Sequence, residues 1–304
     1  MELISDEIFY DLYKTFPINN LQVIGTHDSA CYQLINGNTN SNLVRFANMF
    51  KWIPFVNNII RDWTLTQDRN LYYQLKMGIR AFDLRVTYDP NTQDYYFSHT
   101  FFCVRAKEAL NDIHRYFLEN PHGFLFMIIK PDYEHRTTFT PERNKIFKEL
   151  IYGILGNMLI FKSFGNDGKQ NNYPKLETCI DNGKNIMCAI LDMEFSTESW
   201  IWGPEKFIGK WITELEDEKF YQEVKHFVKD EIGTISHISL VKTPTNESVK
   251  RDVKMRLTCK GRESLLTWSQ KAYEILERLR ADSFKENFYI TTNIFWLDFP
   301  VESL

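Results

Sequence analysis

The chain has 304 residues, of which 43% are hydrophobic and 25% are charged, and its formal net charge is −4 at pH 7. These values are close to those of globular proteins and exclude general disorder. No apolar stretch reaches the ~20 residues of a membrane-spanning helix. Because there is no long basic run, we do not expect sequence-independent nucleic-acid binding.

The N-terminal segment and the cysteines indicate the compartment. The segment MELISDEIFYDLYKTF is acidic and polar, so it is not typical of a secretory signal. The five cysteines are an odd, scattered set, which favours free thiols in a reducing compartment over a disulfide framework. They are Cys31, Cys103, Cys179, Cys188 and Cys259. No pair has CxxC spacing, which argues against a structural zinc site.

Short apolar runs alternate with amphipathic stretches along the chain. Strands are predicted in residues 21–24, 79–86, 95–97, 124–129, 185–191 and 288–299, and helices in 105–120, 212–228 and 270–279. The helix over 105–120 has one apolar face, formed by Ala106, Leu110, Ile113 and Phe117, and Pro121 follows it. Apolar strands that alternate with helices indicate a parallel sheet covered on both faces. The pattern favours an α/β fold of the TIM-type β/α barrel over an open sheet.

Polar side chains recur where the predicted strands end. They are His27 and Asp28, Asp83 and Arg85, His99, Lys130, and Asp298. The carboxyl ends of parallel barrel strands meet on one face, where active sites are built. Two imidazoles can move protons to and from a phosphodiester, and a guanidinium can hold the phosphate. The opposing interpretation is structural, because a single strand-end histidine is often a hydrogen-bonded core residue and an isolated Asp-x-Arg is usually an ion pair.

The remaining histidines fit that structural interpretation. They are His114, His122, His135, His226 and His237, and they lie outside the set of strand ends.

Several strings resemble motifs of the phosphatidylinositol-specific phospholipase C X-domain family. They are residues 24–29 (IGTHDS), 63–67 (WTLTQ), 74–85 (QLKMGIRAFDLR), 126–133 (FMIIKPDY) and 297–300 (LDFP). They occur in the family's order and span most of the chain. The resemblance implies a distorted β/α barrel with parallel strands, a single domain over residues 1–304 that acts as a monomer, and cleavage of inositol phospholipids.

The resemblance also implies roles for the acid–base residues. His27 matches the general base that deprotonates the inositol 2-hydroxyl, which then attacks the phosphorus. His99 matches the general acid that protonates the departing diacylglycerol oxygen. Asp298 would orient His27, and Asp28 would pair with His99. The products would be diacylglycerol and inositol 1,2-cyclic phosphate.

The substrate-binding positions carry over in the same way. Arg85 would bind the phosphate with Asp83 beside it, Lys130 would contact inositol hydroxyls, and Trp211 would lie under the inositol ring. The chain departs from the family in two places. Thr100 follows His99 where glycine is common, and Lys210 stands near a usual acidic position. The second departure leaves the preferred headgroup open.

Arg85 also bears on metal use. The calcium-dependent branch of the family holds its ion with carboxylates on the second strand, and calcium takes six to eight oxygen ligands. Arg85 stands on that strand, and a guanidinium cannot ligate a metal but supplies a fixed positive charge. The resemblance therefore implies the metal-independent, bacterial-like branch, with no metal and no cofactor.

The stretch over residues 43–63 indicates contact with lipid. It is rich in apolar and aromatic residues, with Trp52, Phe55 and Trp63 among them, and Pro54 would kink a helix there. Such a segment beside the active-site mouth is typical of an interfacial helix, although it could equally pack on the barrel. We expect a cytoplasmic protein that is peripheral at a membrane, with another export route left open.

Two other functions are compatible with these patterns. One is a different phosphodiesterase on a related barrel, such as a glycerophosphodiesterase, which would usually need a metal. The other is a catalytically silent barrel that only binds lipid. The presence of His27, His99 and Arg85 together argues against loss of activity.

Overall fold

The computed structural model describes eleven stretches of the chain. They are residues 4–35, 64–99, 101–132, 139–165, 173–191, 198–203, 207–212, 216–230, 235–240, 265–286 and 294–297. The predicted lipid-contact segment over 43–63, with Trp52, Phe55 and Trp63, lies outside them, as do Thr100 and Asp298. The backbone of Trp211 is described, but its side chain is not.

Eight strands form one curled parallel sheet. Their order is β7 (Ile201–Trp202), β6 (Ile186–Ile190), β5 (Leu125–Pro131), β2 (Ala81–Asp89), β1 (Val23–Thr26), β10 (Ile294–Leu297), β9 (Ile235–Ser239) and β8 (Phe207–Trp211). Each neighbouring pair is parallel. Within the described residues, no pairing joins the edge strands β7 and β8, so the barrel is open there. The predicted β/α barrel, distorted and built of parallel strands, is confirmed.

A hairpin departs from the barrel after β2. Strand β3 (Asp94–His99) pairs antiparallel with the end of β2, and β4 (Phe101–Arg105) pairs antiparallel with β3. The prediction that His99 ends a parallel barrel strand is therefore wrong. The strand predicted to end at Val86 continues to Asp89, past the barrel, because its apolar alternation runs on into the hairpin. The chain then turns back and returns His99 to the same end of the barrel as His27.

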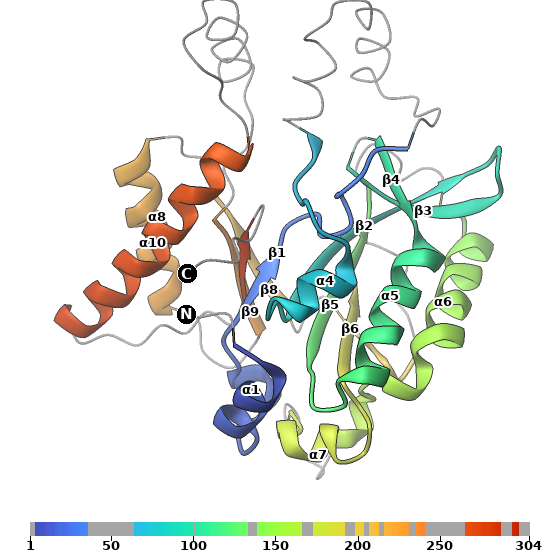
Figure 1. Ribbon diagram of the computed structural model, residues 1–304, viewed down its shortest axis with the longest axis horizontal. Coiled ribbons are helices and arrows are strands. Elements are labelled where there is room, and N and C mark those ends of the chain that lie inside the picture. Colours follow the sequence, from blue (N-terminus) through green and yellow to red (C-terminus); the bar gives the residue numbers. More distant parts are fainter. Residues whose placement is uncertain are drawn as a thin grey trace, which may run out of the picture.

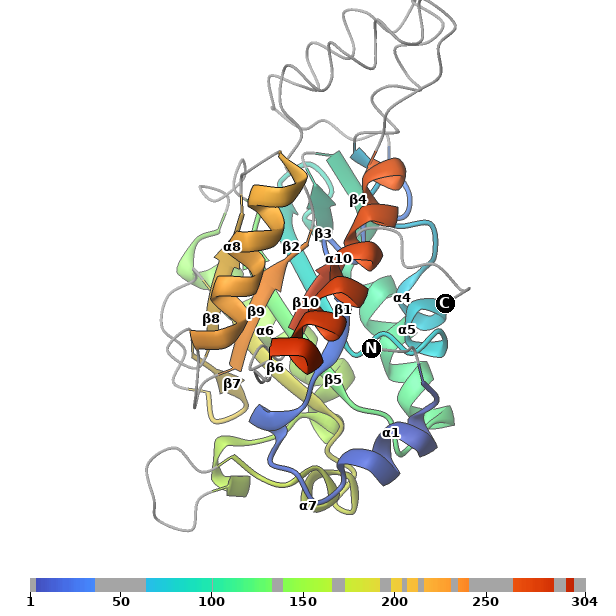
Figure 2. The same ribbon diagram turned by 90° about the vertical axis from the view of Figure 1, so that its left-hand side faces the viewer.

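Helices cover both sides of the sheet. Figure 1 shows α4 (Leu71–Lys76), α5 (Ala106–Glu119) and α6 (Pro141–Leu155) on one side, and α8 (Asp217–Asp230) and α10 (Leu265–Glu286) on the other. Two more helices, α1 (Asp6–Tyr13) and α7 (Leu176–Ile180), lie at the lower end, and Figure 2 gives the view at right angles. Short 3-10 turns occur at Ile18–Asn20, Gly156–Met158 and Lys162–Gly165. No helix in the described part is long and apolar enough to cross a bilayer.

The helix predictions have mixed outcomes. The predicted helix over 105–120 is α5, and its four predicted core residues are buried. The helix predicted over 212–228 corresponds to α8, which begins at Asp217, where the carboxylates of Asp217 and Glu218 suit a helix N-terminus. The helix predicted over 270–279 is part of the longer α10.

Four strands were not predicted, namely β4, β7, β8 and β9. They are short, and in β8 (FIGKW) and β9 (ISHIS) small or polar residues interrupt any continuous apolar run.

The barrel interior is tightly packed around β1. A Cβ atom on Gly25 would lie 2.5 Å from the Trp296 ring and 2.8 Å from the Ala81 Cβ. Only glycine allows β1 to run this close to its neighbours β10 and β2, since contacts below 3.0 Å are overlaps. Below the polar end, the interior is filled by apolar side chains such as Phe126, Ile128 and Met187. This floor supports the residues that follow β1.

Candidate active site

The loop after β1 is fixed by backbone contacts to both neighbouring strands. The His27 N–H donates to the Leu297 carbonyl (2.8 Å), and the Ser29 N–H donates to the Asp83 carbonyl (2.8 Å). The Asp83 N–H donates back to the Ser29 hydroxyl (2.9 Å). Between them, Asp28 has a φ of 42°. A non-glycine residue in this left-handed region is uncommon and often marks a functional site.

Three buried polar side chains hold this loop from outside the barrel. The Gln67 amide donates to the His27 carbonyl (2.8 Å), the Thr66 hydroxyl donates to the Asp28 carbonyl (3.0 Å), and the Gln74 amide donates to the Ser29 carbonyl (2.8 Å). All three are nearly inaccessible to solvent. Two of the motif strings therefore contribute a scaffold, a role that their resemblance to the family did not predict.

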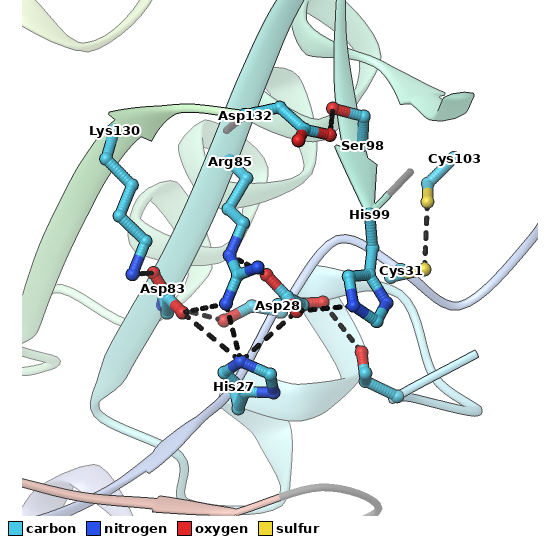
Figure 3. A network of polar contacts seen from close by, with 12 residues as sticks. His27, Asp28, Cys31, Asp83, Arg85, Ser98, His99, Cys103, Lys130 and Asp132 are labelled. Carbon is cyan, nitrogen blue, oxygen red and sulfur yellow. Dashed lines mark hydrogen bonds and ion pairs between the residues drawn. The ribbon is translucent and has the colours of Figure 1, made fainter. Parts of the chain in front are cut away.

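Asp28 is the centre of the polar network (Figure 3). Its Oδ1 lies 2.5 Å from the Arg85 Nε. Its Oδ2 lies 3.2 Å from the His27 Nε2 and 3.5 Å from the His99 Nε2. One buried carboxylate thus faces both imidazoles and the guanidinium. The structure brings together His27 and Asp28 from the loop after β1, Asp83 and Arg85 from β2, His99 from β3 and Lys130 from β5.

The Nε2 atom of His27 is the candidate proton acceptor of the site. Its Nε2 lies 2.8 Å from the Arg85 Nη2. The same nitrogen lies 3.2 Å from the Asp28 Oδ2. The neutral ring protonated on Nδ1 therefore accepts at Nε2 from Arg85, whereas the imidazolium donates from Nε2 to Asp28. The Asp298 predicted to orient the ring lies outside the described residues. In its neutral form, with the lone pair on Nε2, His27 has the arrangement that a general base needs.

His99 is set up in the opposite form. Its Nδ1 lies 2.9 Å from the Thr64 carbonyl oxygen, which can only accept, so Nδ1 carries a proton. Burial alone lowers the pKa of His99, but the Asp28 carboxylate and the neighbouring Cys31 outweigh it and raise the pKa to about 9. At neutral pH both ring nitrogens are therefore protonated, as a general acid requires.

Asp83 and Lys130 form the second ion pair of the site. The Lys130 Nζ lies 3.0 Å from the Asp83 Oδ1. Burial raises the pKa of Asp83, but Lys130, Arg85 and His27 outweigh burial and hold it well below its usual range. The side chains of Arg85, His99 and Lys130 keep 21%, 22% and 31% of their surface exposed, whereas that of Asp83 keeps 4%. The three cationic side chains are therefore partly exposed to solvent, whereas the Asp83 carboxylate beneath them is buried.

This donor set fits a metal ion poorly. Ligand atoms of His27, Asp28 and Asp83 lie within 4.8 Å of one another, as a metal site would need. However, Asp28 already contacts Arg85, and Asp83 already contacts Lys130. A divalent cation here would meet two fixed positive charges and find few of the oxygen ligands that calcium takes.

His237 also faces the barrel interior, although its place in the sequence predicts a structural residue outside the site. Its Nδ1 accepts a hydrogen bond from the Trp296 indole (3.0 Å). Burial, and then the charge of Lys130, lower the pKa of His237 to about 4, so the ring is neutral. A Cβ atom on Gly209 would overlap this ring, so glycine makes room for it. The alternation of Ile235 and His237 in β9 is the only sequence signal for this position.

A further missed contact supports the strand that carries His99. The hydroxyl of Ser98 donates to the Asp132 carboxylate (2.6 Å), and both side chains are buried. Asp132 follows β5 directly, and its N–H donates to the Val86 carbonyl (2.8 Å). The hairpin is thus attached to the barrel next to His99 (Figure 3).

Comparison with known proteins gives relatives and a fold. No protein-family model matches the chain. It is 28% identical to the mouse PI-PLC X domain-containing protein 2 over 150 residues, which are 47% of this chain and 42% of the relative. The chain spans about half the length of the curated relatives it matches first. These relatives confirm the resemblance to the X-domain family that the motifs indicate.

The solved structures agree on the architecture. The phosphatidylinositol-specific phospholipase C of Listeria monocytogenes superimposes with a TM-score of 0.68 at 14% identity, covering 98% of this chain and 96% of that one. The Staphylococcus aureus phosphatidylinositol-specific phospholipase C gives a TM-score of 0.63 at 17% identity, covering 96% and 90%. At such identities the match establishes the bacterial-type barrel fold.

Proposed function

We propose that this chain is a phosphatidylinositol phospholipase C that works without a metal, through His27 and His99. One observation carries the proposal. The Nε2 atoms of His27 and His99 both face one oxygen of Asp28, at 3.2 Å and 3.5 Å respectively. In this mechanism His27 starts neutral, with Nε2 accepting from Arg85, and His99 starts charged, with an acceptor beside each ring nitrogen. This is the pairing that a coupled base and acid require.

The reaction proceeds by one exchange at phosphorus. The His27 Nε2 takes the proton of the inositol 2-hydroxyl, and the oxygen forms a bond to phosphorus. The bond from phosphorus to the diacylglycerol oxygen breaks, and His99 gives its Nε2 proton to that oxygen. The products are inositol 1,2-cyclic phosphate and diacylglycerol, and the two histidines end in exchanged protonation states.

The cations stabilise the charge that develops on phosphate. Arg85 contacts His27 in the free protein and would turn its planar fork to the phosphate oxygens, because two parallel charge-assisted bonds favour that geometry. This movement also releases the His27 Nε2 lone pair for the inositol hydroxyl. Lys130, whose side chain is 31% exposed and pairs with Asp83, would contact inositol hydroxyls.

Lipid binding at a membrane surface is the second element of the proposal. The Staphylococcus aureus phospholipase C that shares this fold is a protein whose membrane binding can be modulated. In this chain, residues 43–63 would serve as the interfacial segment. Changing Trp52 and Phe55 to Ala should weaken binding to vesicles and leave cleavage of a monomeric soluble substrate nearly unchanged. If soluble cleavage and thermal stability fall together with vesicle binding, the segment belongs to the core.

The direct test is product analysis with headgroup-labelled phosphatidylinositol in EDTA. We expect inositol 1,2-cyclic phosphate to form at the same rate with the chelator as without it. Loss of product in EDTA that calcium restores would contradict the metal-free mechanism. Absence of product under both conditions, with vesicle binding intact, would instead indicate a silent lipid-binding barrel.

A further inference from the structure

Two cysteines that are 72 residues apart in sequence meet beside the site. The Sγ atoms of Cys31 and Cys103 lie 2.9 Å apart (Figure 3), and both side chains are free thiols. Cys31 lies in the turn that carries Asp28, and Cys103 lies in β4 of the hairpin that carries His99. With Leu65 they form a small separate cluster of buried residues.

The Cys31 thiol is connected to His99 through one carbonyl group. The thiol donates to the Thr64 carbonyl oxygen (3.3 Å), and the same oxygen accepts from the His99 Nδ1 (2.9 Å). The Cys31 N–H donates to the Asp28 carbonyl (2.8 Å). Any movement of Cys31 is therefore transmitted to His99 and to the residue that bridges both histidines.

We propose that Cys31 and Cys103 are a modification site, where hydrogen peroxide forms a reversible disulfide that slows the site next to it. The two sulfurs need to approach by only about 0.9 Å to reach the ~2.05 Å of an S–S bond. The bond removes the thiol proton given to Thr64 and pulls Cys31 toward the hairpin. The effect on catalysis rests on the proposed function, whereas the formation of the disulfide does not.

The oxidation balances with one peroxide. One thiol loses its proton, and the thiolate attacks a peroxide oxygen, which breaks the O–O bond and gives a sulfenic acid and hydroxide. The hydroxide takes up the released proton and becomes water. The second thiol attacks that sulfur, the S–S bond forms, and hydroxide leaves with the thiol proton as a second water. The two sulfurs lose two electrons, which the peroxide takes.

Burial sets the rate of this reaction. It raises the pKa of the Cys31 thiol well above its usual range, although the charge of His99 opposes the rise. Thiolate is therefore scarce and the reaction is slow. A disulfide buried at this position would also be reduced slowly. The pair is suited to record sustained oxidation instead of a brief pulse.

The first test counts thiols in the whole chain. The protein is treated with hydrogen peroxide, denatured, alkylated with N-ethylmaleimide and weighed by mass spectrometry. All five thiols should react before treatment and three after it, with a linked peptide that joins Cys31 to Cys103. The cross-link should raise Tm by roughly 5–10 °C, since it closes a 72-residue loop. Five reactive thiols after treatment, or a link between other cysteines, would overturn the proposal.

The second test measures cleavage of phosphatidylinositol by the same samples. Turnover of the oxidised protein should fall by about tenfold, because a shift near 1 Å in an acid–base pair is costly, and dithiothreitol should restore it. In the Cys103→Ala and Cys31→Ser variants, turnover should not respond to peroxide. The matched control is Cys179→Ala in α7, at the other end of the barrel. After treatment with peroxide, this variant should lose as much turnover as the wild type does.

The outcomes separate the two claims. A disulfide that leaves turnover unchanged would refute the effect on the site. If the reduced protein cleaves nothing, the proposed function fails, but the thiol count still decides the modification site. The wild-type count needs no variant, so a poorly folding variant does not spoil the test.

Discussion

The molecule buries charge at both ends of its barrel, and the two clusters differ in what they can do. At the lower end, Arg80 pairs with Asp6 of α1. At the upper end, Arg85 pairs with Asp28. Both arginines belong to one short motif, yet Arg80 precedes β2 and Arg85 lies inside it. Their surroundings decide that one is structural and the other is placed for chemistry.

The lower cluster is a buried ion pair with hydrogen bonds to neighbouring elements. The Arg80 Nη2 lies 2.5 Å from the Asp6 Oδ1, and its Nη1 donates to the carbonyls of Leu75 (2.9 Å) and Ile79 (2.8 Å). The Tyr116 hydroxyl donates to the other Asp6 oxygen. Arg80 is 2% exposed, and no histidine takes part in these contacts. Such a network fixes α1 and α5 against the barrel.

The upper cluster holds the same kind of ion pair but adds two imidazoles that face one carboxylate, and cations that reach solvent. A buried ion pair by itself therefore does not indicate catalysis. Groups that can exchange a proton, together with access for a ligand, make the difference.

The largest effect should come from breaking the lower cluster. Arg80→Leu leaves the Asp6 carboxylate buried without its cation and should lower the free energy of unfolding by about 3–5 kcal/mol. Arg85→Leu should cost less stability, because its site is partly exposed and two histidines can offset the charge of Asp28. Urea denaturation of both variants checks this. Equal losses would show that the two clusters are both structural.

The next largest effect concerns the histidines. His27→Ala and His99→Ala should each lower turnover by roughly a hundredfold or more, the scale of a positioned base or acid. An aryl inositol phosphate has a leaving group that needs little protonation, so it should partly rescue His99→Ala but not His27→Ala. Initial rates on both substrates are the measurement. Equal rescue of both variants, or of neither, would contradict the assigned roles.

The pH dependence of stability should be smaller. The pKa of His99 is about 9 in the folded chain, against 6.5 ordinarily. A raised pKa stabilises the fold fully below pH 6.5, and this contribution is lost as pH rises through about 9. The loss should be on the order of 2–3 kcal/mol. Denaturation of the wild type and of His99→Ala between pH 6 and 9.5 isolates the contribution of His99. Parallel curves of unfolding free energy against pH would refute it.

Activity should follow the same group. As the general acid, His99 must be charged, so turnover should fall as pH rises through the alkaline limb of a bell-shaped profile. Because the two histidines face one carboxylate, both limbs belong to the coupled site. A rate that keeps rising above pH 9.5 would exclude His99 as the acid.

Arg85→Lys should have a more modest effect than loss of a histidine. Lysine keeps the charge but lacks the planar fork, so turnover should fall by about tenfold with little loss of stability. Arg80→Lys is the matched control, and it should lower stability without a specific loss of turnover per folded molecule. Unchanged turnover in Arg85→Lys would show that a point charge is sufficient.

The smallest effect is expected at His237. Its pKa of about 4 keeps the ring neutral through the working range, so His237→Gln should leave both limbs of the pH profile in place. A pH–rate profile of the variant from pH 5 to 9.5 is the check. A displaced limb would show that the barrel interior contains a third titrating group.

Several features followed from the sequence alone. The continuous apolar runs of β5 and β6 predicted buried parallel strands, and the spacing in α5 identified its core face, because local periodicity reports which side of an element is covered. The motif strings supplied the identities of His27 and Arg85, and the end of a predicted strand supplied that of His99. Short strands that polar residues interrupt, such as β9, gave too weak a local signal to be predicted.

The tertiary structure alone decided how those residues meet. It returned His99 to His27 on an antiparallel hairpin, placed Thr66 and Gln67 around the β1 loop, and turned His237 inward. It also brought the sulfurs of Cys31 and Cys103 to 2.9 Å, although their scattered positions in the sequence argued against any pairing. Local pattern fixes the face that a side chain occupies. Contacts between distant residues depend instead on strand order, register and the turns between strands, which no local window contains.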